Sequence, residues 1–426
     1  MVIYTVRQGD SVYSIASKYG VPMQKVLDDN RIENPQQLVV GQALVIMTDQ
    51  VSHVVTAGES LYTIAQSYQT TVQQLLEANP GITNPSRILA GQTIAVPVVS
   101  RKLGIIDVNG YALPGISDTV LTETLPYLTY ISIFSYPVKA DGELSAPDDT
   151  PILQAAEKSH AAPLMVITNT EEGKGFQSDI AHSILTDGQV SDNLLNNVVS
   201  VLQQKNYFGL NIDFEYIYQQ DRESYNDFLR KAVDRLRPLG YIVTTSLAPK
   251  TSAIQRGLLY EAHDYPVHGS VADRVILMTY EWGYTYGPAR PVAPLNLVEQ
   301  VVKYAVSVMP NEKILMGIPN YGYDWTLPFV RGTAAQSLTN PGAVRLAAEV
   351  GAHIQFDTAA QSPFFSYYAS NGKKHTVWFE DARSMEAKLY LVNRYQLGGI
   401  SYWTINSFFP QNWLVLESLY QIRKVR

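Results

Sequence analysis

An internal repeat near the amino terminus constrains the fold of this chain more than any other feature. A segment of about 46 residues, from Val2 to Met47, matches a second segment that lies 49 residues further on. The matched pieces are Tyr4-Thr5-Val6 and His53-Val54-Val55, Gly9-Asp10-Ser11 and Gly58-Glu59-Ser60, Asn30 and Asn79, and Gly41-Gln42 and Gly91-Gln92. Two segments with one pattern are expected to adopt one fold.

Each copy predicts a βααβ unit, over residues 1–48 and 51–98. A short strand leads into a glycine-acid turn, a helix capped by Ser11 or Ser60, a second helix ending near the asparagine, and a final strand such as Ala43 to Met47. Units this small bury only small cores. We therefore expect the two copies to add binding contacts through effective concentration rather than to build one larger fold.

The repeats resemble LysM modules through the elements G-D-S-x-x-x-I-A and N-P…G-Q. The resemblance implies binding to N-acetylglucosamine chains, as in peptidoglycan and chitin. For single residues such as Gly9, Asp10 and Asn30, a purely structural role in turns and caps is the alternative interpretation.

From residue 102 to residue 426, apolar strand-like runs alternate with amphipathic segments such as Ser224 to Arg237 and Asn296 to Val308. The candidate strands are Leu103 to Val108, Tyr127 to Tyr136, Pro163 to Thr168, Gly209 to Glu215, Ile242 to Leu247, Arg274 to Tyr280, Lys313 to Pro319 and Gly398 to Trp403. Eight such units predict an α/β fold, a (β/α)8 TIM barrel with its active site at the carboxyl ends of the strands.

The segment at about 329–378 is too long for a simple loop and contains two strand-like pieces, Gln355 to Asp357 and His375 to Phe379. It predicts a small α+β insertion between strands seven and eight. We expect this insertion to form one wall of a cleft.

The fourth candidate strand carries the most informative side chains. Because side chains alternate along a strand, Asn211, Asp213 and Glu215 are expected on one face, pointing into the barrel. Two carboxylates this close do not both ionise freely, so Asp213 is expected to raise the pKa of Glu215 and keep it protonated as a general acid. The alternatives are a solvated strand end or an ion pair with Arg274 or Arg290.

The run from Phe208 to Glu215 resembles the signature D-G-x-D-x-D-x-E of family 18 glycoside hydrolases, the chitinase family. The resemblance implies a retaining reaction in which the substrate's own acetamido group is the nucleophile. It places the acid on Glu215 and the residue that orients the acetamido group on Asp213. The sequence departs from the signature at Phe208 and Asn211, and Asn211 is expected to hydrogen-bond Asp213 without carrying a charge.

Other strand ends support this resemblance. Met278-Thr279-Tyr280-Glu281 resembles the M-x-Y-D element of the family, which implies that Tyr280 holds the acetamido oxygen and that Glu281 contacts its surroundings. Trp403 corresponds to the tryptophan beneath the sugar at the cleavage site, and Tyr321 and Tyr323 are further candidates for lining the cleft. For any one of these aromatic residues, ordinary core packing is the alternative.

Several classes of partner are not expected. The net charge is -7 and basic residues are scattered, so nucleic acid is an unexpected partner. No run has the ~20 apolar residues of a membrane span, and the start at Met1 lacks the features of a signal peptide. The chain has no cysteine, and its histidines, which include His263 and His268, form no His-Glu-x-x-His run, so we expect no metal and no cofactor. No Gly-x-Ser-x-Gly elbow follows a strand, so a Ser-His-Asp hydrolase is not expected. We expect a monomer that is made in the cytosol.

The whole arrangement resembles the spore cortex-lytic N-acetylglucosaminidases of spore-forming bacilli. That resemblance implies a substrate of peptidoglycan cortex fragments, cleaved during germination by an enzyme deposited in the spore coat or cortex region. Two alternatives stay open on the sequence alone: an inactive glycan-binding protein like the chitinase-like lectins, and a chitinase.

Overall fold

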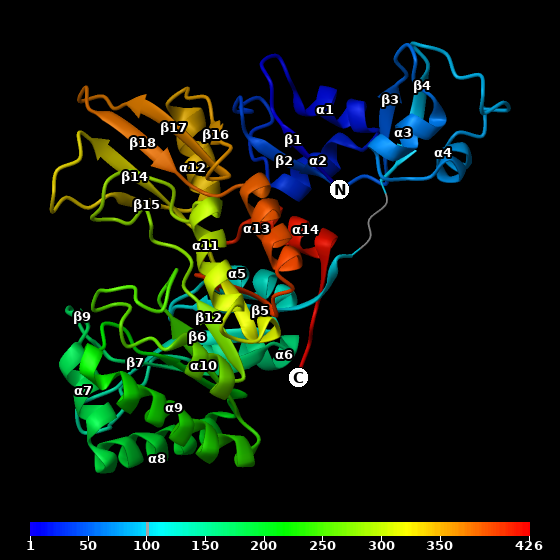
Figure 1. Cartoon of the computed structure of the whole chain (residues 1–426). Coiled ribbons are helices and arrows are strands. Elements are labelled where there is room, and N and C mark those ends of the chain that lie inside the picture. Colours follow the sequence, from blue (N-terminus) through cyan, green and yellow to red (C-terminus); the bar gives the residue numbers. More distant parts are fainter. Residues whose placement is uncertain (99–101) are drawn as a thin grey trace.

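A computed structural model describes residues 1–98 and 102–426 and contains a closed barrel of eight parallel strands (Figure 1). Neighbouring strands pair in the order β5, β6, β7, β10, β11, β12, β13 and β19, and β19 pairs back to β5. Their bounds are β5 Gly104–Ala112, β6 Tyr130–Pro137, β7 Ala162–Thr168, β10 Gly209–Asp213, β11 Ile242–Leu247, β12 Arg274–Leu277, β13 Ile314–Pro319 and β19 Gly399–Trp403. The predicted TIM barrel is confirmed.

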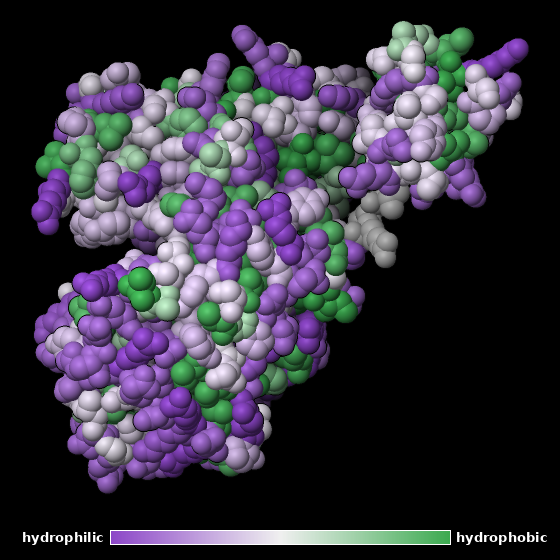
Figure 2. All heavy atoms as spheres, viewed as in Figure 1, coloured by the Kyte–Doolittle hydropathy of each residue, from purple (hydrophilic) through white to green (hydrophobic). Residues whose placement is uncertain are grey.

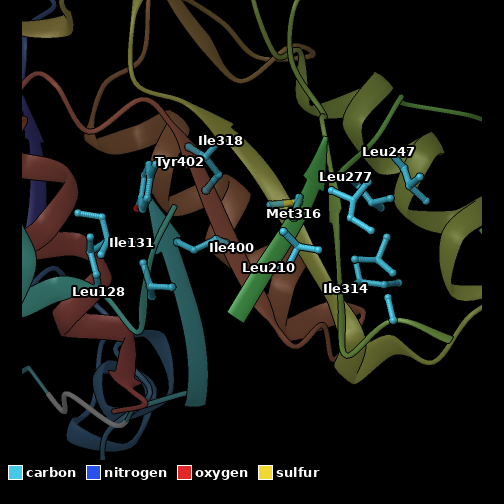
Figure 3. Close-up of a cluster of buried hydrophobic side chains, with 14 of the residues drawn as sticks. Leu128, Ile131, Leu210, Leu247, Leu277, Ile314, Met316, Ile318, Ile400 and Tyr402 are labelled. Carbon is cyan, nitrogen blue, oxygen red and sulfur yellow. The ribbon is translucent and has the colours of Figure 1, made fainter. Parts of the chain in front are cut away.

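The alternation of side chains along the strands creates two apolar layers. Outward-facing residues such as Leu210, Leu277 and Ile400 are fully buried between the strands and the outer helices (Figure 3). Inside the barrel, Val166 and Ile276 pack in a smaller cluster. The outer helices are α5 Asp118–Thr124, α6 Thr150–Ser159, α7 Ser178–Thr186, α8 Gly188–Lys205, α9 Arg222–Leu236, α10 Tyr265–Val271, α11 Leu295–Val306, α13 Ala382–Arg394 and α14 Pro410–Leu419.

Two barrel strands end earlier than the sequence pattern predicts. β10 ends at Asp213 instead of Glu215, and β12 ends at Leu277 instead of Tyr280. Past Asp213 the backbone contacts a loop in place of a strand, because the backbone oxygen of Phe214 accepts from the His263 ring at 3.0 Å. Glu215 and Tyr280 therefore lie on the loops directly above the barrel.

The predicted insertion between the seventh and eighth strands is present as a five-stranded sheet with one helix. Its elements are β14 Gly322–Leu327, β15 Gln336–Leu338, α12 Asn340–Glu349, β16 Gln355–Asp357, β17 Ser362–Tyr368 and β18 Lys374–Trp378. The sheet begins at Gly322, ahead of the boundary at about residue 329 taken from the sequence. Its own apolar cluster includes Phe365 and Val377, both fully buried.

Both repeats fold as βααβ units. The elements are β1 Val2–Thr5, α1 Val12–Tyr19, α2 Met23–Asn30 and β2 Ala43–Ile46, then β3 Gln50–Val54, α3 Leu61–Ser67, α4 Val72–Ala78 and β4 Thr93–Pro97. Ser11 and Ser60 cap α1 and α3 as predicted. Asn30 and Asn79 each use the side chain to join a helix to the last strand, as in the 2.7 Å bond from the Val45 amide to Asn30 Oδ1. These asparagines have the structural role considered above.

The first repeat packs against the barrel domain and its insertion, an arrangement that the sequence left open. Ala43 and Val45 of β2 belong to the main apolar core together with the barrel helices, and Val39 belongs to the core of the insertion. The cause is apolar side chains on the outward face of the first repeat, which need cover from water.

Among residues 1–98 and 102–426, no helix is both long and apolar enough to cross a membrane.

Candidate active site

Asp213 and Glu215 lie at the carboxyl end of β10, at the mouth of the barrel. Asp213 is only 4% exposed, and its Oδ1 atom has no hydrogen-bond partner among the described residues. Burial raises the pKa of Asp213 to about 7, partly offset by a hydrogen bond from Ser246. Burial raises the pKa of the half-buried Glu215 well above its usual range, and the charges of Asp213 and Glu281 raise it further. The two carboxyl groups are therefore arranged to retain a proton near neutral pH.

Two side chains that the sequence did not assign to this site fix the backbone around Glu215. The buried Asn169, just after β7, donates to the backbone oxygen of Glu215 at 2.8 Å and accepts from its amide at 2.9 Å. His263 accepts from the Ala248 amide through Nδ1, so its Nε2 carries the proton and donates to the Phe214 oxygen at 3.0 Å. Burial lowers the pKa of His263 to about 4, which keeps it neutral. Asn169 follows β7 and His263 lies just before α10, so the local pattern of β10 reveals neither.

Asn211 does not take the role predicted for it. Its side chain is fully buried, its Nδ2 donates to Thr244 Oγ1 at 2.8 Å, and its Oδ1 accepts from the Tyr111 hydroxyl at 3.0 Å. It forms no hydrogen bond with Asp213 among the described residues. Because two residues of strand span ~7 Å, Asn211 lies a layer below Asp213, inside the barrel and away from the cleft. Asn211 thus belongs to the packing beneath the site and does not line the cleft.

Tyr280 and Glu281 lie above β12, beside the same carboxyl pair. The Tyr280 hydroxyl has no hydrogen-bond partner among the described residues, and its pKa is raised by burial and then by Tyr111, Asp213 and Glu215. Gly317 of β13 makes room for the ring, because a Cβ atom there would lie 2.8 Å from it. Glu281 Oε1 accepts hydrogen bonds from the hydroxyl groups of the two predicted cleft tyrosines, one from Tyr321 and one at 3.0 Å from Tyr323.

Trp403 is the last residue of β19 and is half-buried. The rings of Phe134 and Tyr111 contact it edge to face, with centroids 4.8 and 5.4 Å from its own. Trp403, Tyr321 and Tyr323 line a pocket of about 320 Å³ that is completed by residues of the insertion, Ser337, Leu338 and Thr339, and by Asn320, Thr404, Asn406 and Ser407. Figure 2 shows an indentation of the surface between the insertion and the barrel. The insertion thus forms one wall beside the predicted site residues.

The ion pair considered for Glu215 and the histidines of this region can be compared with the geometry. Arg274 pairs with Asp107 at 2.7 Å, and among the described residues neither Arg274 nor Arg290 forms an ion pair with Glu215. His268 is fully buried, and its Nδ1 lies 3.1 Å from Thr245 Oγ1. Within the described part of the chain, no three histidine, cysteine, aspartate or glutamate side chains are grouped to hold a metal ion.

Comparison with known proteins agrees with this geometry. Residues 108–407 match glycosyl hydrolases family 18, and residues 4–46 and 53–97 match the LysM domain. The cortical fragment-lytic enzyme of Bacillus subtilis (strain 168) is 42% identical, over 100% of this chain and 99% of its own. That of Bacillus anthracis is 41% identical, over 99% of each chain.

Among solved structures, the spore cortex-lytic enzyme SleL of Bacillus megaterium QM B1551 aligns with a TM-score of 0.92 at 37% identity, covering 100% of this chain and 99% of that one. SleL of Bacillus cereus gives 0.86 at 40% identity, covering 99% and 98%. The chain therefore belongs to family 18 of the glycosyl hydrolases and is a glycosidase that carries two LysM domains.

Proposed function

We propose that this glycosidase is a retaining N-acetylglucosaminidase that hydrolyses peptidoglycan fragments of the spore cortex during germination. The names of the relatives, cortical fragment-lytic and spore cortex-lytic enzymes, support this substrate. The LysM domains support retention on a polymer that contains N-acetylglucosamine. We further propose that the protein acts as a monomer in the coat or cortex region of the spore.

One observation supports the acetamido group as the nucleophile. Beside Glu215, and among residues 1–98 and 102–426, the Oδ1 atom of Asp213 is an acceptor without a partner and the Tyr280 hydroxyl is a donor without one. An acetamido group carries the complementary pair, an N–H donor and a carbonyl acceptor. An amide N–H bound to Asp213 and a carbonyl bound to Tyr280 would satisfy both groups and fix the carbonyl oxygen for attack.

The reaction then runs in two steps. Glu215 gives its proton to the glycosidic oxygen while the acetamido oxygen bonds to C1, so the glycosidic bond breaks and an oxazolinium ring forms. The carboxylate of Asp213 stabilises the positive charge of that ring. Glu215, now a carboxylate, takes a proton from water as the water attacks C1, and the ring opens to restore the acetamido group. Two displacements at C1 retain its configuration.

Removal of the acetyl group from the substrate tests this mechanism. Chemically de-N-acetylated cortex fragments should be bound but not cut, whereas the N-acetylated fragments are cut with retention of configuration at C1. Mass spectrometry of the products and proton NMR of the newly formed anomer measure both results. Equal rates on the two substrates would contradict substrate assistance. Chitin oligomers offered beside the cortex fragments measure the preference between the two polymers.

Tyr280→Phe removes one hydroxyl group and keeps the ring. We expect kcat on N-acetylated fragments to fall by about 10- to 100-fold, because one hydrogen bond that orients the nucleophile is worth ~1.5–3 kcal/mol in the transition state. The melting temperature should stay near that of the wild type, since the hydroxyl forms no hydrogen bond with the part of the chain that the structure describes. Tyr321→Phe is the matched control, because Tyr321 bonds Glu281 instead. Comparable losses in the two variants would show that Tyr280 has no special role.

A further inference from the structure

The two LysM domains present different outer faces, although their inner faces match. Leu44 and Ile46 of the first domain correspond to Ile94 and Val96 of the second, and all four are buried within their own domains. On the outer face, however, Ile3 corresponds to Ser52 and Ala43 to Thr93. The apolar face of the first domain packs onto α13 and α14 of the catalytic domain.

The segment before the last strand shows the same contrast. Val39 is 5% exposed in the core of the insertion, whereas its counterpart Leu89 is 71% exposed. The Ile354 amide, at the base of the insertion sheet, donates to the Val40 oxygen at 2.9 Å. A Cβ atom on Gly41 would lie 1.7 Å from the Ile354 oxygen, whereas one on Gly91 would meet nothing within 4 Å. The first domain therefore packs against the insertion through this segment, whereas the corresponding segment of the second domain is exposed.

The part of the insertion that contacts the first LysM domain is connected to the pocket beside Trp403. Thr339, which caps α12, lines the pocket together with Trp403. The next residue, Asn340, donates to Asn320 Oδ1 at 3.4 Å, and Asn320 in turn donates to the backbone oxygen of Thr404 at 2.9 Å. A shift of α12 against the first LysM domain would thus move the wall of the pocket beside Trp403.

The second LysM domain has a core that is separate from the rest of the chain. Its core consists of its own residues only, including Ile64, Leu75 and Ile94. Among the described residues, no hydrogen bond or ion pair joins residues 50–98 to the catalytic domain. The main packing of the second domain against another part of the chain is between its β3 and α1 of the first LysM domain. Figure 1 shows it at the edge of the molecule, beside the first LysM domain.

We infer that the two LysM domains have different tasks: the first is a positioning domain that holds the insertion wall of the cleft, and the second is the one that retains the polymer. This inference rests on the proposed function, which supplies the polymer that the second domain would bind. It assigns Val39 and Gly41 as positioning residues of the glycosidase, although both belong to a LysM domain.

A pair of equivalent glycines tests the positioning role. Gly41 and Gly91 have nearly equal positive φ angles of 88° and 86°, so alanine strains the backbone similarly at both, and only Gly41 faces Ile354. We expect Gly41→Ala to raise KM for soluble fragments about fivefold with kcat changed less than about twofold, because a wall that binds the sugar moves while the acid stays in place. Gly91→Ala should keep the KM of the wild type. Val39→Ala and Leu89→Ala form a milder pair for the same comparison if Gly41→Ala does not fold.

The role of the second domain in holding the polymer is tested with Ile64→Asp. This variant places a charge in the separate core of that domain, where Ile64 is fully buried. Adsorption of the full chain to insoluble peptidoglycan should be lost, while KM for soluble fragments stays at the wild-type value. Gly41→Ala should adsorb like the wild type. Equal KM changes in the glycine pair and the valine-leucine pair, or full adsorption by Ile64→Asp, would overturn the inference. A wild-type protein that neither adsorbs nor cuts would instead overturn the proposed function.

Discussion

Glu215→Gln should lower kcat on soluble cortex fragments by about 10²- to 10⁴-fold, the usual contribution of a general acid. The amide has the size of the carboxyl group but no proton to give to the departing sugar oxygen. Because Glu215 is expected to be protonated and uncharged near neutral pH, the neutral amide should preserve both KM and the melting temperature. Release of reducing ends measures the first effect, and differential scanning fluorimetry the second.

Glu281→Gln is the matched control for this substitution. Glu281 also raises the pKa of Glu215 but is occupied by Tyr321 and Tyr323, so its loss should shift the pH profile without abolishing turnover. If Glu215→Gln keeps a tenth or more of the wild-type kcat, on the order of 1.4 kcal/mol in the barrier, Glu215 is not the acid.

Asp213→Asn should lower turnover strongly and at the same time stabilise the fold above neutral pH. The pKa of Asp213 is raised by burial to about 7 from 3.8, so the folded state binds a proton that the unfolded state has released between these values. The cost of keeping this carboxylate buried is therefore absent below about pH 4, grows up to pH 7 and is complete above it. An uncharged asparagine avoids that cost, on the order of 2–4 kcal/mol.

We expect the melting temperature of Asp213→Asn to exceed that of the wild type at pH 8 and to match it at pH 4. The fall in kcat should be about 100-fold or more, because the asparagine carries no charge to stabilise the oxazolinium ring. A variant that is less stable than the wild type at pH 8, with normal turnover, would contradict both the burial cost and the role in catalysis.

Much of the barrel follows from the sequence because its strands are short apolar runs with clear ends. β11 has the predicted bounds, Ile242–Leu247, since Gly240 precedes the run and Pro249 follows it. β10 was predicted two residues too long because alternation continues through Glu215, whereas the chain leaves the sheet at Asp213. The error concerns the functional residue itself, whose backbone is held by Asn169 from another strand end.

Contacts between distant parts of the chain explain what the sequence did not reveal. The bond expected from Asn211 to Asp213 is replaced by bonds to Tyr111 and Thr244, which come from other strands of the closed barrel. The sequence does contain a signal for the packing of the first LysM domain, because Ile3 and Ala43 are apolar where Ser52 and Thr93 of the second copy are polar. A comparison of the outer faces of the two repeats would have indicated it.

The protonation of Glu215 can be observed directly by carbon NMR of the protein with ¹³C-labelled glutamate carboxyl groups, with Glu215→Gln identifying the signal. The pKa of Glu215 should lie well above the ordinary value of about 4.3 in the wild type and should fall in Asp213→Asn, where the neighbouring charge is absent. A Glu215 signal that titrates at the ordinary value, and that is unchanged when Asp213 is replaced, would contradict the assignment of Glu215 as the acid.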